Sequence, residues 1–183
     1  MKSSLRIAGD VYEKTANNDI KNILDEEISN KIQDDPFYET WVRDMSDLCK
    51  TFCYLEKSHF VSFWVSSNRG CRRYHIDNVP RRLLVTYAGQ GTEWLPDEAV
   101  NRDAYTNGEP NKNILKDTSA KQFINKWDVA IFKGGPKGLL HRTPDTALRD
   151  RSILMRLDHA GFWKKIQKNV EQNKQISTPR RNQ

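Results

Sequence analysis

Hydrophobic residues near the N-terminus recur at helical spacing and predict two amphipathic helices. The first stripe consists of Ile20, Ile23, Leu24, Ile28 and Ile32, and the second of Trp41, Met45, Leu48, Phe52 and Leu55. Members of each stripe are separated by about one helical turn or a multiple of it, so their side chains share one face. The first helix is expected to begin at Asn18 and to end before Pro36, and the second to span 38–57.

Beyond residue 58 the pattern changes to short runs of aromatic and β-branched residues, which are typical of strands. We expect strands at 59–66, 71–77, 82–88, 92–95, 126–132, 139–143 and 151–157. The polar stretch 96–122 has no such period and is predicted to be a loop, a natural candidate for a substrate lid. Helices followed by short strands favour a mainly β fold with flanking helices, an antiparallel barrel or sandwich.

These patterns divide the 183 residues into three parts of one domain-sized chain. Residues 1–57 are expected to form a helical segment that packs on the barrel, 58–160 the β-barrel with the functional site, and 161–183 a basic tail. The net charge of +6 is concentrated in 164–183, which contain six basic residues and one acidic residue. The body is therefore almost neutral, and nucleic-acid binding is not expected beyond weak contacts of the tail.

The sequence also predicts where the protein works. No apolar run reaches the roughly 18 residues that a membrane span needs, and the N-terminus has no apolar segment typical of a secretory signal. Three cysteines are few and odd in number, which favours free thiols in a reducing compartment. We therefore expect a cytoplasmic protein with no membrane partner.

His75 and Asp77 are the strongest candidates for chemistry. One residue separates them in a predicted strand, so their side chains point to the same face. His141 follows on another short predicted strand. Two imidazoles and one carboxylate form the facial triad that holds Fe(II) in non-haem oxygenases and leaves coordination positions open. Without His141, the first two residues would be interpreted as a hydrogen-bonded pair that orders a strand end.

Two segments carry a resemblance to a known family. CRRYHIDNVPRRLLVTYAGQGTEWLP and GLLHRTP…RSILMRLD are similar to domain-of-unknown-function family 1826, an uncharacterised bacterial family, and the likeness covers roughly 35–160. The order His75-x-Asp77, His141 and a later arginine resembles, more remotely, the Fe(II)/2-oxoglutarate-dependent dioxygenases. That resemblance implies a double-stranded β-helix, a jelly-roll or cupin-like barrel. It also implies an enzyme in which Fe(II), 2-oxoglutarate and O₂ hydroxylate an unknown small-molecule or protein substrate.

The resemblance also implies an arginine that binds the distal carboxylate of 2-oxoglutarate. Arg151 is the first candidate, because it begins the final predicted strand and the alternate residues after it are apolar. The Arg-x-Ser pair common in that superfamily is not matched, since Ser152 follows Arg151 directly. The other candidate contacts to the co-substrate and its pocket are Arg142, Arg149, Arg156 and Tyr87.

Three alternatives use the same residue types. The triad can hold Zn²⁺ in a module that binds metal or a partner without catalysis. It can also activate water in a zinc-dependent hydrolase, for which Glu93 is the only acidic residue we nominate as general base. Finally, Cys49, Cys53, Cys71 and His75 can be combined into a structural zinc site, although their spacings are not the usual ones.

Overall fold

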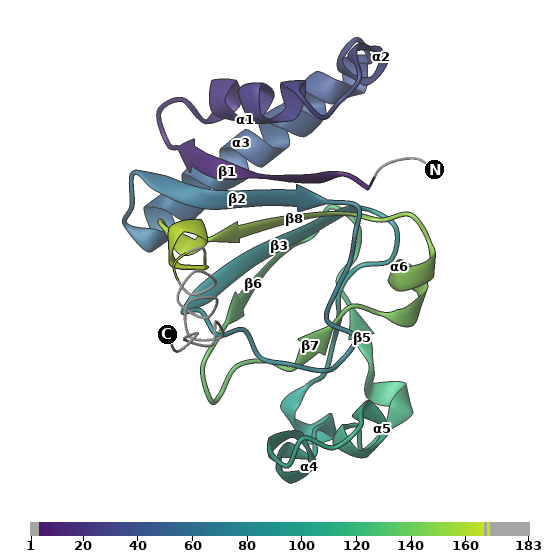
Figure 1. Ribbon diagram of the computed structural model, residues 1–183. Helices are drawn as coiled ribbons and strands as arrows, with labels where there is room; N and C mark the ends of the chain where they lie inside the picture. Colours follow the sequence, from purple (N-terminus) through teal and green to yellow (C-terminus); the bar gives the residue numbers. More distant parts are fainter. Residues whose placement is uncertain (1–3, 167, 169–183) are drawn as a thin grey trace, which may run out of the picture.

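The computed structural model describes residues 4–166 and residue 168, which form two antiparallel sheets with helices on one side (Figure 1). The larger sheet has the order β1 (Arg6–Tyr12), β2 (Phe60–Ser66), β8 (Ile153–Asp158), β3 (Arg81–Ala88) and β6 (Val129–Lys133). The smaller sheet has the order β5 (Gln122–Phe123), β4 (Glu93–Trp94) and β7 (His141–Arg142). Within the described residues the two sheets do not close into a barrel.

Helices cover the outer face of the larger sheet. Three helices stand where two were predicted: α1 (Ala16–Asp25), α2 (Asn30–Gln33) and α3 (Pro36–Glu56). The first predicted helix is divided, because α1 ends at Asp25 and the short helix α2 follows it. α3 begins at Pro36, where the side chain of Asp35 accepts a hydrogen bond from the backbone N–H of Phe37 at 2.8 Å. It ends at Lys57, whose φ of 51° places it in the left-handed region.

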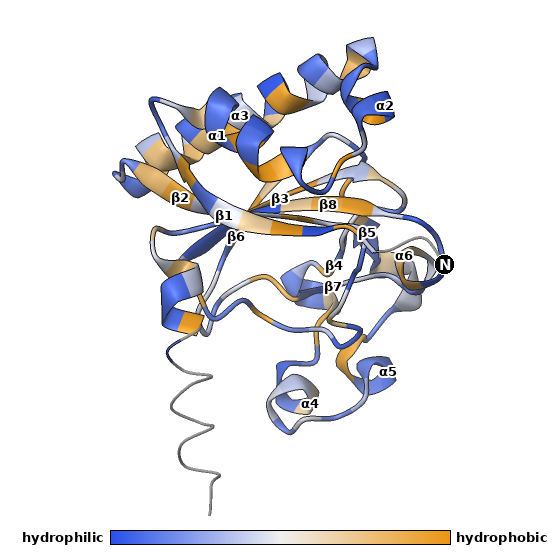
Figure 2. Ribbon diagram, turned by 45° about the horizontal axis from the view of Figure 1, so that its top comes forward, coloured by the Kyte–Doolittle hydropathy of each residue, from blue (hydrophilic) through white to orange (hydrophobic). Residues whose placement is uncertain are grey.

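The main core lies between these helices and the larger sheet (Figure 2). The fully buried residues of the helices include Ile20, Leu24, Val42, Met45 and Phe52, and those of the strands include Val61, Phe63, Val65, Met155 and Leu157. Along β2 and β8 these residues alternate with others that face the smaller sheet, because neighbouring side chains of a strand point to opposite faces. The interior between the two sheets is thus lined by the other half of the same strands.

The polar stretch 96–122 is not a plain loop, contrary to the prediction. It contains η1 (Asp97–Ala99), α4 (Arg102–Thr106), α5 (Asn111–Ile114) and η2 (Thr118–Ala120). Its apolar side chains form a second small core with Tyr74, Leu95 and Leu140. Helices of four or five residues are too short to show a 3.6-residue period, so the sequence pattern does not disclose them.

Two further expectations concern the ends of the chain. The N-terminal segment 1–57 is not only helical, since β1 pairs with β2 along its whole length and extends the sheet. α6 (Asp145–Arg149) precedes β8, and a helical segment at 162–166 follows it. Most of the predicted basic tail, 169–183, lies outside the described residues. None of the described helices is both long and apolar enough to cross a membrane.

Candidate metal centre

A single backbone bridge brings the two candidate histidines together. His75 and His141 face each other in an antiparallel bridge, with His75 N donating to His141 O at 3.0 Å and His141 N donating to His75 O at 3.1 Å. Their ring centroids lie 4.5 Å apart. The predicted strand at 71–77 is reduced to this bridge. His75 and Asp77 nevertheless lie on the same side of the chain, as predicted.

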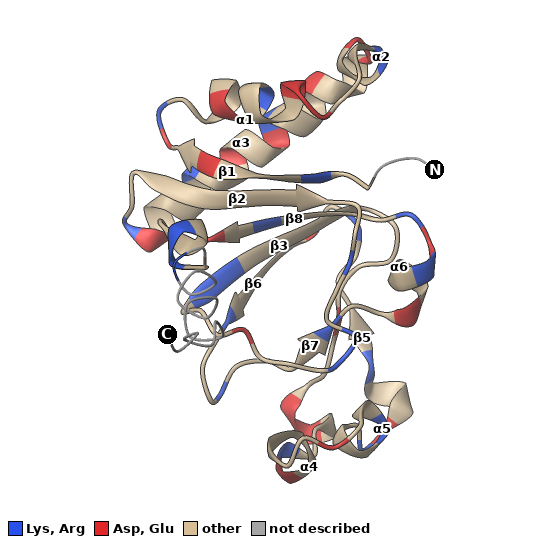
Figure 3. Cartoon of the chain, in the orientation of Figure 1, with Lys and Arg blue, Asp and Glu red and all other residues tan. Residues whose placement is uncertain are grey.

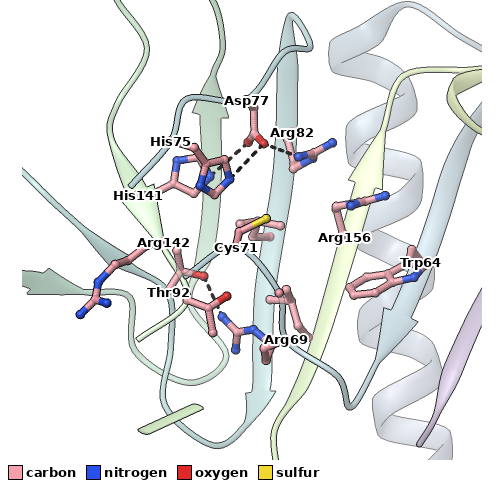
Figure 4. A pocket seen from close by; sticks show the side chains of 14 residues that line it. Trp64, Arg69, Cys71, His75, Asp77, Arg82, Thr92, His141, Arg142 and Arg156 are labelled. Carbon is pink, nitrogen blue, oxygen red and sulfur yellow. Dashed lines mark hydrogen bonds and ion pairs between the residues drawn. The ribbon is translucent and has the colours of Figure 1, made fainter. Parts of the chain in front are cut away.

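Asp77 completes the group on the same side of the chain (Figure 4). One carboxylate oxygen, Oδ2, lies 3.3 Å from His141 Nε2, and the other, Oδ1, lies 3.9 Å from His75 Nε2. One ligand atom from each residue can be chosen so that all lie within 4.8 Å of one another. Atoms that bind one metal ion at adjacent positions are separated by about 3 Å, given bond lengths near 2.1 Å.

Both imidazoles are oriented by the backbone. His75 Nδ1 lies 3.1 Å from Arg73 O, and His141 Nδ1 lies 3.0 Å from Leu139 O. A carbonyl oxygen only accepts, so in the neutral ring Nδ1 carries the proton and Nε2 presents its lone pair. Metal-binding histidines are typically held in this way. The two lone pairs point toward Asp77.

The neighbourhood of Asp77 fits a bound cation. Asp77 and His141 are each only 3% exposed. Asp77 Oδ2 is buried and has no hydrogen-bond partner among the described residues. Because Nε2 of His141 is an acceptor in this tautomer, two acceptors face each other at 3.3 Å. A divalent cation between them satisfies both, and a nitrogen-and-oxygen donor set suits Fe(II) and Zn²⁺.

Charged and aromatic neighbours hold this group in place. Arg82 Nη1 donates to Asp77 Oδ1, and Arg82 Nε donates to Asp158 Oδ1 at 2.8 Å. Burial raises the pKa of the Asp77 carboxyl, but the adjacent charge of Arg82 favours the ionised form, so the pKa is lowered and Asp77 stays ionised. Phe132 stacks on the ring of His141 at 4.3 Å between centroids.

A small cavity of about 100 Å³ opens beside the three residues, between the two sheets. Four arginines contribute to its walls: Arg69, Arg82, Arg142 and Arg156. The basic segments on β3 and β8 are visible in Figure 3. The cavity combines a candidate metal site with an excess of guanidinium groups, which is the chemistry expected for a small anionic ligand.

Comparison with known proteins places this site within a family. The family described as "Protein of unknown function (DUF1826)" matches residues 5–158. The chain belongs to this family. No curated protein matches the sequence. The match covers both sheets and all three metal-ligand candidates but brings no activity with it, so the function of this DUF1826 protein has to be inferred from its site.

Two predicted contacts of this DUF1826 protein lie away from the cavity. Arg151 is exposed just before β8 and is not part of the cavity wall. Tyr87 lies in the main core under α3, where its hydroxyl donates to Asp44 Oδ2 at 2.6 Å. The alternate residues that follow Arg151 face the helices, whereas the other face of β8, with Leu154 and Arg156, lines the cavity.

Arg156 is the predicted arginine that the structure brings to the cavity. Its guanidinium lies 5.0–5.2 Å from the ring centroids of Trp64, Phe162 and Trp163. Its Nε lies 2.8 Å from Asp158 Oδ2, close enough for an ion pair but not aligned for a hydrogen bond. Cation–π contacts of this kind fix the plane of a guanidinium group. Of the other two predicted anchors, Arg149 lies in α6 and is not part of the cavity wall.

The other predicted anchor, Arg142, points away from the triad (Figure 4). Its Nε and Nη2 donate to Glu93 at 3.0 and 2.9 Å, and Tyr74 also donates its hydroxyl to Glu93. Glu93 is buried and is not part of the cavity wall. Its two oxygens are thus already bound, which removes the general base on which the hydrolase hypothesis depends.

The cysteines do not assemble into a zinc site. Cys49 and Cys53 are buried in the main core, where burial raises the pKa of both thiols. Cys71 lies apart from them on the cavity wall, where the neighbouring His75 lowers the pKa of its thiol. Among the described residues, His75, Asp77 and His141 are the one group of three or more metal-binding side chains close enough to share an ion.

Sequence inspection alone missed four residues that shape the site: Trp64, Arg69, Arg82 and Asp158. Arg82 begins the predicted strand 82–88, and Asp158 directly follows the predicted strand 151–157, so a charged residue next to an apolar run was the available signal. Arg69 lies in a turn, where no periodicity indicates the direction of a side chain.

Metal binding is expected to weaken as the pH falls through the pKa of His75. Burial lowers this pKa, but the contact with Cys71 and the carbonyl of Arg73 outweigh it, so it lies above the ordinary 6.5. A proton on Nε2 competes directly with the metal, so the affinity is highest above this pKa and is lost below it. Cys71→Ala removes the largest of the causes that raise the pKa of His75 and should move the loss of metal to lower pH.

This dependence can be measured as Zn²⁺ retention against a chelator between about pH 5 and 8. His59→Ala is the matched control, because His59 is exposed and lies outside the cavity. The His59→Ala variant should leave the midpoint pH of Zn²⁺ loss unchanged. A midpoint that stays fixed or rises in Cys71→Ala would contradict the expectation.

Proposed function

We propose that this protein is a non-haem Fe(II)- and 2-oxoglutarate-dependent oxygenase that acts on a small substrate. The observation that carries the proposal is the convergence of two imidazole lone pairs on the Asp77 carboxylate, whose Oδ2 has no hydrogen-bond partner among the described residues. His75, Asp77 and His141 would hold the metal through one face. When bound, Fe(II) supplies the open coordination positions at which 2-oxoglutarate and O₂ react.

The order of the strands supports a double-stranded β-helix. From β2 onward, the chain passes back and forth between the two sheets. β2 lies in the larger sheet, the segment at His75 is bridged to His141 beside the smaller sheet, and β3 lies in the larger sheet again. β4 and β5 then lie in the smaller sheet, β6 in the larger, β7 in the smaller and β8 in the larger. Such alternation between two facing antiparallel sheets is the pattern of a jelly roll.

Arg156 is proposed to bind the distal carboxylate of 2-oxoglutarate. It lines the same cavity as the metal ligands, and aromatic rings hold its guanidinium. Among the described residues, no hydrogen bond occupies its Nη atoms. A guanidinium group with two free parallel donors binds a carboxylate in a bidentate manner.

The protein's own residues have three roles in this scheme. Arg82 keeps Asp77 ionised and fixes its rotamer, and Asp158 holds Arg82 in place, so that the Asp77 carboxylate remains available as a ligand. The carbonyls of Arg73 and Leu139 keep the protons on Nδ1 and direct Nε2 to the metal position. Phe132 stacks on His141 and restricts the access of water to that ring.

A non-catalytic zinc protein is the second candidate. Cys71 lies on the cavity wall and its thiol contacts His75. Thiolate sulfur favours zinc over iron in a site of mixed ligands. In this alternative the triad holds Zn²⁺ permanently and 2-oxoglutarate has no binding site.

Anaerobic addition of Fe(II) and then 2-oxoglutarate tests the proposal. The parent protein should develop the visible metal-to-ligand charge-transfer band of a chelated 2-oxoglutarate. Arg156→Gln should need about tenfold or more additional 2-oxoglutarate to reach the same band, because a charge-assisted hydrogen-bonded pair is lost. Arg151→Gln is the matched control, since Arg151 is exposed on the same chain segment, and it should behave like the parent.

The outcomes separate the two candidates. No band, together with stoichiometric Zn²⁺ that survives purification, would reject the oxygenase and favour the zinc protein. Equal effects of Arg156→Gln and Arg151→Gln would reject Arg156 as the anchor while retaining the metal site.

A further inference from the structure

Arg69 is the arginine of the cavity that has no carboxylate partner among the described residues. Its Nη1 donates to the carbonyl of Gln90 at 3.2 Å and to the hydroxyl of Ser152 at 3.0 Å. Its Nη2 donates to the hydroxyl of Thr92 at 3.2 Å. All three acceptors are neutral. The Nε of Arg69 is buried and has no hydrogen-bond partner in the described part of the chain.

The position of the Arg69 guanidinium costs stability unless a ligand neutralises its charge. Burial lowers the pKa of Arg69 to about 10, so the guanidinium remains charged at neutral pH. Arg69 is half-buried, and a partly desolvated charge without a counter-ion is unfavourable. A ligand that supplies the missing charge would offset this cost, and perturbed groups of this kind cluster at functional sites. The neutral hydrogen bonds hold the guanidinium in one orientation on the cavity wall without neutralising it (Figure 4).

The remaining charges of the cavity compensate one another. Arg82 and Arg156 are matched by the carboxylates of Asp77 and Asp158. In the proposed function, the two charges of Fe(II) are matched by the two carboxylates of 2-oxoglutarate. One positive charge is then left over, that of Arg69, and it belongs to no ligand assigned so far.

We propose that Arg69 and the hydroxyl of Thr92 bind a carboxylate of the substrate, so that the substrate is a small carboxylic acid. The inference rests on the proposed function, because the charge balance includes 2-oxoglutarate. The Thr92 hydroxyl accepts from Arg69, so its proton is free to donate to a substrate oxygen. A carboxylate carries the single charge that is missing, whereas a phosphate monoester carries about 1.5 to 2. Beside 2-oxoglutarate, only a small group can enter the cavity of about 100 Å³.

Calorimetric titration with simple probes tests this site. Butyrate, its neutral isostere butyramide, and inorganic phosphate are titrated into the protein loaded anaerobically with Fe(II) and saturating 2-oxoglutarate. Butyrate should bind about tenfold or more tightly than either other probe, because it gains a charge-assisted hydrogen bond at matched charge. Arg69→Gln should lose butyrate binding by a similar factor and keep its affinity for 2-oxoglutarate, and Arg69→Lys should recover part of the loss.

Several results would overturn the proposal. Equal binding of butyrate and butyramide would exclude a charged subsite, and tighter binding of phosphate would assign a different substrate class. Loss of 2-oxoglutarate rather than butyrate in Arg69→Gln would make Arg69 the co-substrate anchor. If Arg69→Gln fails to fold, Thr92→Val carries the test and should weaken butyrate binding alone.

Failure of the proposed function has a separate signature. A protein that binds neither Fe(II) nor 2-oxoglutarate is then titrated with butyrate directly. Binding that depends on Arg69 would still support the carboxylate site, and its absence would overturn it.

Discussion

Asp77→Ala is expected to raise the dissociation constant for Fe(II) or Zn²⁺ by about 100-fold or more, because it removes one of three ligands and the only anionic one. Loss of residues that merely support metal ligands already costs about 10- to 100-fold. Metal content after dialysis and competition with a chromogenic chelator give the constant. In the anaerobic experiment, the same variant should show no charge-transfer band at metal and 2-oxoglutarate concentrations that saturate the parent.

The fold of Asp77→Ala should survive, which makes the measurement interpretable. Arg82 loses one carboxylate but keeps the second, since its Nε still donates to Asp158. The control is Asp128→Ala, in which an exposed carboxylate distant from the triad in sequence is removed. It should bind metal like the parent. Parental metal affinity in Asp77→Ala would leave His75 and Asp77 as a pair that orders the strand end, and the metal hypothesis would fall.

Two of the three candidate metal ligands were predictable as a pair because their geometry is local. The two-residue period of an extended chain places His75 and Asp77 on one face whatever the surrounding fold. His141 needed the resemblance as well, because its pairing with His75 is a contact between distant parts of the chain. The helices α1 and α3 were predictable for the same local reason, since their apolar stripes each cover several turns.

The arginine proposed to bind the co-substrate was harder to predict, because β8 is buried on both faces. Leu154 and Met155 are both buried, although one faces the cavity and the other the helices. Alternation of apolar residues therefore does not distinguish the two faces, and a shift by one residue exchanges them. The prediction of Arg151 followed the face that packs on the helices, whereas Arg156 lies on the face that lines the cavity.

Arg69 could not be assigned from the sequence for a different reason. It lies in the turn after β2, and the direction of its side chain is set by contacts with Gln90, Thr92 and Ser152, which are distant in sequence. The fold determines these contacts, and no local pattern reports them. Arg69 is important because it has no carboxylate partner among the described residues. Only a structure discloses the lack of such a partner.

Glu93→Gln is expected to reduce the free energy of unfolding by about 3–5 kcal/mol, the range measured when one member of a buried ion pair is removed. Glu93 is 2% exposed and accepts two hydrogen bonds from Arg142 and one from Tyr74. The neutral amide leaves the buried guanidinium with only the exposed carboxylate of Asp145, 3.3 Å away, as counter-charge. Because Glu93 pairs with Arg142 across β4 and β7, the strand that carries His141 should also loosen.

Denaturant unfolding of the metal-free protein measures the effect without interference from the site. Asp97→Asn is the matched control, since Asp97 forms an exposed ion pair with Arg102 and exposed pairs contribute about 1 kcal/mol or less. The double variant Glu93→Gln/Arg142→Met removes both charges and should lie closer to the parent than Glu93→Gln does, because no charge is left unpaired. Equal stability of the parent and Glu93→Gln would show that this carboxylate does not support the fold.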